Sequence, residues 1–138
     1  MVYNAKYKEQ KRKEGGIKME INTFDIVRVD FGEVEFAGEQ GGIRPAVVIQ
    51  NKLGNIHSST TIVIPFTTKI KHLQQPTHSL FYEDKDKGLS QDSMLLGECV
   101  RQVSKERIMK KLGSITKIQE KKKVKAVYDA NFGLIEEV

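Results

Sequence analysis

The sequence has few cysteines, no tryptophan and no long apolar run. Cys99 is the single cysteine among 138 residues. One cysteine cannot form an internal disulfide, which is typical of proteins kept in a reducing compartment. No apolar stretch approaches the roughly 18 residues that a membrane-spanning helix needs, and the N-terminal residues lack the apolar segment of a secretory signal. We therefore expect a soluble, cytoplasmic protein that does not interact with membranes.

Several familiar site motifs are also missing. The sequence contains no GxxxxGK[ST] or GxGxxG phosphate-binding loop, no GxSxG nucleophile turn and no Cys/His spacing typical of zinc sites. We therefore expect no cofactor and no metal. Cys99 lies in the apolar-rich segment "SMLLGECVRQV", which favours a buried thiol over a nucleophile.

Positive charge is concentrated at the N-terminus. The net charge is +5, but residues 1–18 alone contain six Lys or Arg and two Asp or Glu, whereas the remaining chain has 17 basic and 16 acidic residues. This distribution predicts a basic, flexible N-terminal extension over residues 1–18 and one compact domain over residues 19–138. A nucleic-acid site in the domain must therefore be a local basic patch.

Short β-branched and alternating segments dominate the domain. They predict strands at residues 25–32, 46–50, 60–66, 77–82 and 93–103, with a mobile loop at 33–42. Gly54 and Asn55 are expected to form a turn between the second and third strands, and Gly97 suggests a bulge. Hairpin-length links favour an antiparallel sheet that closes on itself as a small barrel.

Two helices are also expected. Ser104 can cap a helix over residues 105–112, with Val103 and Ile108 as a hydrophobic staple and Gly113 at its end. Thr116 and Gln119 fit a capping box for a C-terminal helix. An apolar stripe on that helix predicts core packing, and its lysine run predicts a solvated surface; the stripe comprises Val124, Val127, Tyr128 and Leu134 or Ile135, and the run Lys121 to Lys123.

For the three histidines and for Arg44, a functional role and a structural role are both considered. His57, His72 and His78 have no carboxylate close by in sequence, so surface or packing roles are favoured over an acid/base pair. Arg44 stands between the acidic loop and an apolar strand. Its position alone leaves two interpretations open, a side chain that points into solvent and a catalytic one.

Four segments together resemble the MazF/PemK family of toxin endoribonucleases. They are "GEQGGIRPAVVIQN", "TTIVIPFTT", "PTH" and "DSMLLGECVRQV", and the resemblance extends over residues 24–134. It implies a mainly β fold with added α structure, namely a small SH3-like antiparallel barrel with a short helix and a C-terminal helix. It also implies a homodimeric, metal-independent enzyme that cuts single-stranded mRNA at specific short sequences and is neutralised by a cognate antitoxin protein.

The resemblance also implies roles for individual residues. The catalytic arginine of the family falls on Arg44 and the catalytic threonine on Thr67. Arginine offers a rigid fork of donors for two phosphate oxygens, and its high pKa favours a phosphate clamp over a general base. The expected RNA-contacting residues are Glu39, Gln40, Gly41, Gly42, Gln50, Asn51, Thr68 and Arg101.

Structural alternatives stay open for several of these residues. For Gln50 and Asn51, bonds to turn residues are favoured over contacts with bases. Arg101 is suited to a contact with RNA or a dimer partner and equally to a surface ion pair. Thr68 is the alternative to Thr67 as the catalytic threonine. Gly38 stands where many members have serine, and the loop is one residue longer and lacks a proline, which affects the expected cleavage specificity. The alternative functions are a gyrase-poisoning toxin of the same barrel fold and a noncatalytic nucleic-acid-binding module.

Overall fold

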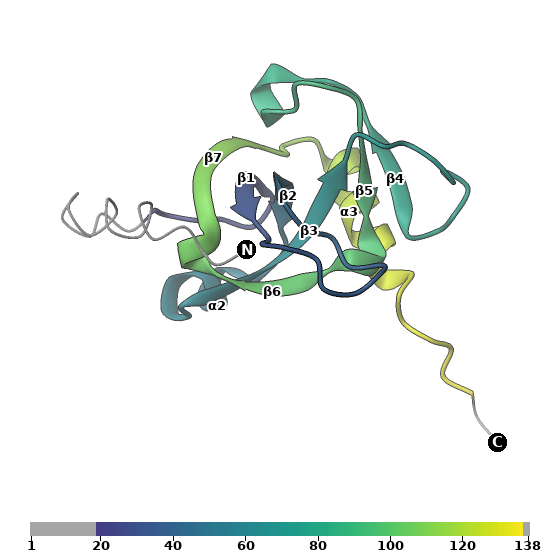
Figure 1. Cartoon of the computed structure of the whole chain (residues 1–138), viewed down its shortest axis with the longest axis horizontal. Helices are drawn as coiled ribbons and strands as arrows, with labels where there is room; N and C mark the ends of the chain where they lie inside the picture. Colours follow the sequence, from purple (N-terminus) through teal and green to yellow (C-terminus); the bar gives the residue numbers. More distant parts are fainter. Residues whose placement is uncertain (1–18, 137–138) are drawn as a thin grey trace.

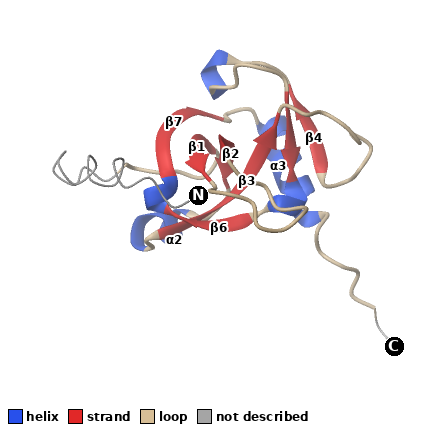
Figure 2. Cartoon of the chain, in the orientation of Figure 1, coloured by secondary structure: helices blue, strands red, loops and turns tan. Residues whose placement is uncertain are grey.

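The structure is a computed structural model that describes residues 19–136. The predicted basic extension, residues 1–18, lies outside the described residues. The described chain folds into strands and two α-helices that are joined by turns and loops (Figures 1 and 2). The strands are β1 (Asp25–Asp30), β2 (Ile43–Val48), β3 (Thr60–Thr67), β4 (His78–Phe81), β5 (Ser93–Leu96), β6 (Arg101–Ser104) and β7 (Ile108–Ser114). The helices are α2 (Lys52–His57) and α3 (Ile118–Asp129), with 3-10 turns η1 (Lys85–Lys87), η2 (Gly97–Cys99) and η3 (Lys105–Arg107).

The strands form one antiparallel sheet of seven, in the order β4-β5-β3-β2-β1-β7, with β6 paired to β3 beside β5. The prediction of a mainly β, antiparallel fold with added helices is therefore confirmed. Within residues 19–136, none of the described helices is long and apolar enough to cross a membrane.

The predicted closure into a barrel is wrong, because no described strand pairing joins β4 to β7. The chain between β4 and β5 turns through η1 and packs against β7 without forming a ladder. Close backbone approach explains this packing: a Cβ on Gly113 would lie 2.3 Å from the carbonyl oxygen of Asp86, and one on Gly88 would lie 2.4 Å from Cβ of Leu112. Turn η1 and the residues beside it thus pack against β7 where strand pairing would be needed to close the barrel.

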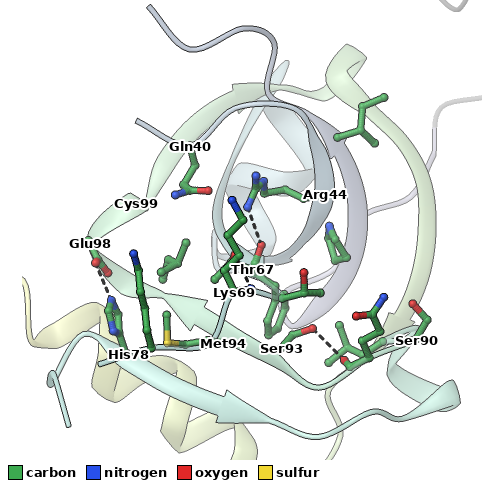
Figure 3. A pocket seen from close by; sticks show the side chains of 18 of the residues that line it. Gln40, Arg44, Thr67, Lys69, His78, Ser90, Ser93, Met94, Glu98 and Cys99 are labelled. Atoms are coloured by element: carbon green, nitrogen blue, oxygen red, sulfur yellow. Dashed lines mark hydrogen bonds and ion pairs between the residues drawn. The ribbon is translucent and has the colours of Figure 1, made fainter. Parts of the chain in front are cut away.

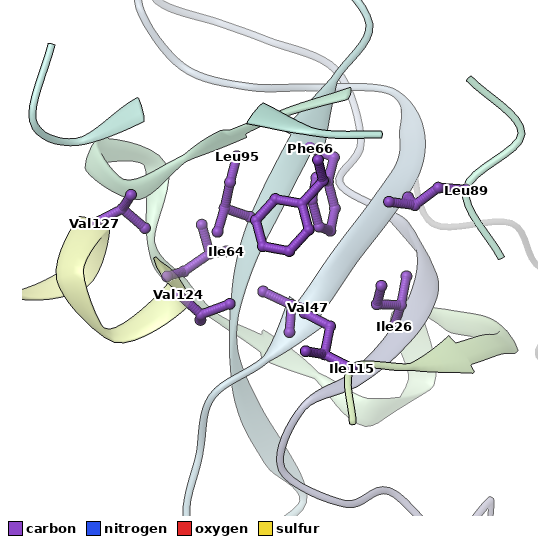
Figure 4. Packing of buried hydrophobic residues seen from close by; sticks show 10 residues of the cluster. Ile26, Val47, Ile64, Phe66, Leu89, Leu95, Ile115, Val124 and Val127 are labelled. Carbon is purple, nitrogen blue, oxygen red and sulfur yellow. The ribbon is translucent and has the colours of Figure 1, made fainter. Parts of the chain in front are cut away.

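Apolar side chains alternate along the central strands and build two cores. Val47 and Ile64 belong to one cluster, which Val124 and Val127 of α3 cover (Figure 4). Ala46 and Val63, the neighbours of these residues in sequence, belong to the second cluster. Period-two alternation therefore places the clusters on opposite faces of the same strands.

The turn predicted at Gly54 and Asn55 is instead the short helix α2. Asn51 caps it, because its side-chain Oδ1 accepts a hydrogen bond from the backbone N–H of Gly54 at 2.9 Å. Asparagine is a preferred N-cap residue. Local bonding of Asn51, one of its two expected roles, is thus what the structure shows.

The helix predicted at residues 105–112 is also wrong. The Ser104 hydroxyl does accept from the backbone N–H of Glu106 at 3.2 Å, but only the 3-10 turn η3 follows. The chain then continues as β7, which pairs with the open edge of β1 from Val29↔Ile108 to Asp25↔Ser114. Pairing with β1 outweighs the local helical pattern, as tertiary context commonly does.

The C-terminal helix was predicted correctly, but its cap was not. Helix α3 begins at Ile118 after Lys117, which makes no side-chain cap bond, so the capping box of Thr116 and Gln119 does not form. Val124 and Val127 are buried as expected, whereas Tyr128, Leu134 and Ile135 are exposed. Two lysines of the predicted solvated run contact aromatic rings: the Nζ atom of Lys121 lies 5.2 Å from the ring centre of Phe24, and that of Lys123 4.5 Å from Phe81.

The irregularity predicted at Gly97 is larger than a simple bulge. The pair Phe66↔Leu95 would place Val63 opposite Glu98 if the strand ran on, but Val63 pairs with Arg101. Turn η2 accounts for the offset. A Cβ on Gly97 would lie 2.4 Å from the carbonyl oxygen of Val127 and 2.8 Å from that of Thr77, so only glycine allows η2 to pack this closely.

Candidate active site

A pocket of about 710 Å³ lies where β2 begins and β3 ends (Figure 3). Its walls come from the loop before β2, the segment between β3 and β4, strand β5 and turn η2. Among the residues predicted for the site, four line it: Gln40, Arg44, Thr67 and Thr68.

Sheet register brings the two predicted catalytic residues together. Strands β2 and β3 pair through Ala46↔Pro65, and continuing this register by two residues puts Thr67 opposite Arg44. Directly opposed side chains on neighbouring antiparallel strands lie side by side. The two residues are 23 positions apart in sequence, yet Figure 3 shows them next to each other in the pocket.

Arg44 is held in place by the backbone. Its Nε donates to the carbonyl oxygen of Gly41 at 3.0 Å, and one terminal nitrogen donates to that of Phe66 at 3.3 Å. Burial lowers the pKa of Arg44, while the nearby Cys99 acts in the opposite direction. Among the described residues, two of its five N–H donors thus have protein acceptors, and the remaining donors are available to an anion.

The hydroxyl of Thr67 also has a defined place. Its Oγ1 accepts a hydrogen bond from the backbone N–H of Lys69 at 3.2 Å. A hydroxyl that accepts one bond keeps its own hydrogen and a second lone pair for a ligand. Thr67 is half-buried, whereas its neighbour Thr68 is exposed at the pocket rim.

Gly41 and Gly42, which precede Arg44, adopt backbone positions that a residue with a side chain would not readily take. A Cβ on Gly41 would lie 2.4 Å from a methyl carbon of Val34, so the position has no room for a side chain. Gly42 adopts a left-handed φ of +77° and donates from its backbone N–H to the carbonyl oxygen of Gly32 at 2.7 Å. Both glycines therefore have a defined backbone position at the end of the loop that was predicted to be mobile, and the mobility of the loop stays a prediction. Glu39 is exposed and does not line the pocket.

The pocket is positively charged. Its lining includes four side chains with a permanent positive charge, against the carboxylate of Glu98; the four are Arg28, Arg44, Lys69 and Lys71. Because the domain as a whole is nearly neutral, a nucleic-acid site in it was expected to be a local basic patch. The pocket is such a patch. Within residues 19–136, no three His, Cys, Asp or Glu side chains gather as a metal site would need.

Six of the eight predicted RNA contacts do not line the pocket. Besides Glu39, Gly41 and Gly42 of the loop, they are three residues that lie elsewhere, Gln50, Asn51 and Arg101. The side-chain amide nitrogen of Gln50 donates to Oδ1 of Asn55 and to the carbonyl oxygen of Thr60, both at 3.1 Å, and Asn51 caps α2. The guanidinium of Arg101 stacks over Phe31, 5.4 Å from the ring centre. None of the three lines the pocket, and each has a role within the fold.

Sequence analysis missed a histidine–carboxylate pair at the pocket wall. Nε2 of His78 lies 2.7 Å from Oε2 of Glu98, and both residues line the pocket. Burial acts to lower the pKa of His78, but hydrogen bonds to Glu98 and to backbone carbonyls outweigh it, and the net shift is upward. The two residues are 20 positions apart and meet because His78 pairs with Leu96 at the end of β5. Only the strand register could have revealed the pair.

Cys99, half-buried, sits on the same turn. Burial raises the pKa of its thiol, and the Glu98 carboxylate raises it further, while Arg44 lowers it. A thiol with a raised pKa is a poor nucleophile near neutral pH. That Cys99 is not the nucleophile stays a prediction, which this direction favours; its side chain contributes to the pocket lining rather than to a core.

Residues 22–128 match the model of the PemK-like, MazF-like toxin family of type II toxin–antitoxin systems. The chain belongs to this family. Over 110 residues it is 38% identical to Endoribonuclease MazF of Staphylococcus saprophyticus subsp. saprophyticus, a match that covers 80% of this chain and 89% of the relative. The family identified from the sequence motifs is thus confirmed.

Two solved structures share the fold. An endoribonuclease in complex with its cognate antitoxin from Mycobacterial species matches with a TM-score of 0.65 at 18% identity, over 85% of this chain and 99% of that one. MazF from Deinococcus radiodurans, in its Form-I crystal, matches with a TM-score of 0.65 at 19% identity, over 81% of this chain and 93% of that one. At these identities the similarity concerns the fold alone.

Proposed function

We propose that this PemK-like, MazF-like toxin is a metal-independent endoribonuclease that cuts single-stranded mRNA at specific short sequences. The endoribonuclease class follows from the family and from the relative named Endoribonuclease MazF, which is 38% identical over most of both chains. The observation that carries the proposed site is the pairing of a backbone-anchored Arg44 with the Thr67 hydroxyl inside a basic pocket. An anionic, phosphodiester substrate fits this charge.

Metal-free RNA scission can proceed by attack of the ribose 2′-OH on the adjacent phosphate. The reaction needs removal of a proton, stabilisation of charge on the phosphorane and protonation of the leaving 5′-oxygen. Arg44 would supply the second of these, because a guanidinium held by two carbonyls is already oriented before substrate arrives. Its pKa is lowered by burial, yet arginine in proteins stays protonated, which favours a clamp over a general base.

Thr67 would position the reacting group. With its oxygen already accepting from Lys69, the hydroxyl can donate to a phosphate oxygen or hold the 2′-OH beside Arg44. Lys69, Lys71 and Arg28 would hold phosphates on either side of the cleaved bond. Gln40 and Thr68, at the pocket wall, are the predicted RNA contacts that remain best placed to touch bases or sugars.

The partners of the enzyme belong to the same proposal. We infer that it acts as the toxin of a toxin–antitoxin pair in the cytoplasm, neutralised by a cognate antitoxin, and that it works as a homodimer. A solved structural relative is an endoribonuclease in complex with its cognate antitoxin, which supports the inference. The finer description of the sheet as SH3-like, although it is open between β4 and β7, is likewise a proposal; it is supported by the pairing of β3 with three strands, β2, β5 and β6.

The test is incubation of the purified full chain with a long single-stranded RNA in excess EDTA, with cut sites mapped by primer extension. The proposal predicts discrete cuts by the wild type and strongly reduced cutting at the same positions by the Arg44→Ala and Thr67→Ala variants. Absence of cuts by folded, antitoxin-free wild type would contradict it and would favour a gyrase-poisoning or noncatalytic role.

A further inference from the structure

The segment between β3 and β4, residues 68–77, forms one wall of the pocket and carries Lys69 and Lys71. At its start it is tied to the site through the bond from the Lys69 backbone to Thr67. Its position over the rest of its length depends on its other end, where it enters β4 at His78. The contacts there determine where the two lysines are held.

His78 joins this segment to turn η2. Its Nδ1 lies 3.0 Å from the carbonyl oxygen of His72, and its Nε2 lies 2.7 Å from the carboxylate of Glu98. A carbonyl oxygen can only accept, so Nδ1 carries a hydrogen; an ionised carboxylate can only accept, so Nε2 carries one as well. Both contacts are satisfied together when the imidazole is positively charged.

The segment folds around these two contacts. His72 has a left-handed φ of +56°, uncommon for a residue with a side chain, and its carbonyl oxygen also accepts from the backbone N–H of Gln75 at 3.0 Å. The side-chain amide of Gln75 reaches the same carboxylate oxygen of Glu98 at 3.3 Å. Gln75 of the segment and His78, the residue that follows the segment, therefore meet at Glu98.

The backbone of turn η2, which carries Glu98, is held by several contacts. The preceding residue, Gly97, is packed against α3 and accepts a hydrogen bond from the side-chain amide of Asn131 at 2.7 Å. Its backbone N–H donates to the carbonyl oxygen of Thr77, the last residue of the segment, at 2.8 Å, so the backbone of the segment is attached to η2 as well. Turn η2 is fixed to the body of the protein through Asn131 and through its packing on α3, and Glu98 is the side chain of η2 that the segment contacts.

We propose that His78 and Glu98 are positioning residues, a charged clasp that holds residues 68–77 across the pocket so that Lys69 and Lys71 face the RNA. This inference rests on the proposed function, whose substrate the lysines would bind. Neither residue takes part in the chemistry; both act through the lysines. Figure 3 shows the pair at the pocket edge, with Lys69 pointing into the centre.

The clasp depends on protonation of His78. Its pKa is raised in the folded protein, so the contribution of the clasp is complete below the ordinary histidine pKa and is lost as pH rises through the folded value. Above that value the lone pair of Nε2 would face the carboxylate. Other titratable groups around the pair are Cys99 on η2, Lys71 and His72 on the segment, and Lys123 of α3, which bonds the carbonyl of Leu80 on β4.

Glu98→Gln is the decisive variant because it keeps the size of the side chain and removes its charge. If Glu98 were only a negative charge in a basic pocket, its removal would strengthen RNA binding and lower KM. The clasp predicts the opposite: KM for RNA rises roughly tenfold at pH 6.5 or so while kcat changes little, because a charge-assisted hydrogen bond is lost. Glu98→Asp should recover part of the loss.

Two further readouts separate positioning from a general structural effect. The wild-type KM should rise as pH increases through the His78 pKa, and the KM of Glu98→Gln should not. The salt dependence of KM should also become shallower in the variant, because fewer lysines contact phosphates. His57→Gln is the matched control, since His57 is exposed on α2 and does not line the pocket; it should behave as wild type.

Amide hydrogen exchange of residues 68–77 tests the clasp without RNA. Exchange at a fixed pH should be faster in Glu98→Gln than in wild type or His57→Gln, while α3 and the central strands stay protected. An unchanged or lower KM with unchanged exchange would overturn the clasp. A fall in kcat alone would instead make His78 a proton donor in the reaction. If the wild type does not cut RNA, the proposed function fails, and hydrogen exchange still decides the clasp.

Discussion

Strand β2 has polar side chains near both ends, and the two ends use them differently. Beyond its last residue, Gln50 and the buried Asn55 bond each other twice, and the Thr61 hydroxyl donates to Oδ1 of Asn55 at 2.8 Å. At its first residues, Arg44 uses two donors to hold its own position and leaves the others facing a pocket. Donors without protein acceptors, rather than polarity alone, mark the end that binds a ligand.

The same sequence segment, residues 38–51, contains both ends, and both were candidates for RNA contact. Their separation teaches that residues within one family motif serve different purposes. The Gln50–Asn55–Thr61 network fixes α2 onto the sheet, whereas the Arg44–Thr67 pair faces the pocket. Substitutions at the two ends should therefore have effects of different kinds.

Arg44→Ala should have the largest effect on activity. Removing one preorganised donor to a developing charge typically costs about 10²- to 10³-fold in rate, and we expect a loss of this size in kcat. The melting temperature should stay close to that of wild type, because Arg44 is only half-buried and bonds two backbone carbonyls. The measurement is single-turnover cleavage of a defined RNA, with circular dichroism as the control for folding.

Thr67→Val should come next. Valine keeps the shape of threonine and removes the hydroxyl, so the rate of cleavage should fall by about 10- to 100-fold, the value of a hydrogen bond to a charged group. Thr67→Ser keeps the hydroxyl and should retain most of the activity. Equal activity of the valine and wild-type enzymes would exclude the hydroxyl from the reaction.

Asn55→Ala, at the opposite end of β2, should act on stability instead. Loss of the buried amide leaves the Thr61 hydroxyl without its acceptor and removes one of the two acceptors of the Gln50 amide, which should lower the free energy of unfolding by about 1–3 kcal/mol. Urea denaturation measures this change. The cleavage rate of the folded fraction should equal that of wild type, and a specific loss of cleavage would place this end of β2 in the active site.

Asn51→Ala should have the smallest effect. The substitution removes the N-cap of α2 and should cost about 1 kcal/mol of stability. RNA binding, measured by fluorescence anisotropy, should not change. A weakened affinity without a change in stability would restore Asn51 as an RNA contact.

The sequence predicted most of the sheet because alternation along β1 and the β-branched run of β3 are local signals. It failed at residues 105–112, where a helical pattern and a correct Ser104 cap are overruled by pairing of β7 with β1, across about 80 residues of chain. Closure of the barrel failed for a similar reason. Packing of η1 against β7 depends on Gly88 and Gly113, which no local pattern reveals.

The candidate site shows the same difference between what local patterns predict and what long-range strand pairing decides. Arg44 and Thr67 were predicted through family resemblance, and the register of β2 on β3 brings them together. The His78–Glu98 pair was not predicted, because no carboxylate lies close to His78 in sequence. The pairing of β4 with β5 brings Glu98, 20 residues away, next to it. Long-range register is the information that sequence patterns lacked in each case.

The most direct test compares the two ends of β2 in one experiment. Arg44→Ala and Asn55→Ala are assayed side by side for single-turnover cleavage of the same RNA in EDTA and for the urea midpoint of unfolding. The account predicts a rate loss of about 10²-fold or more without a change in midpoint for Arg44→Ala, and a lowered midpoint with an unchanged rate for Asn55→Ala. Undiminished cleavage by Arg44→Ala would contradict the account.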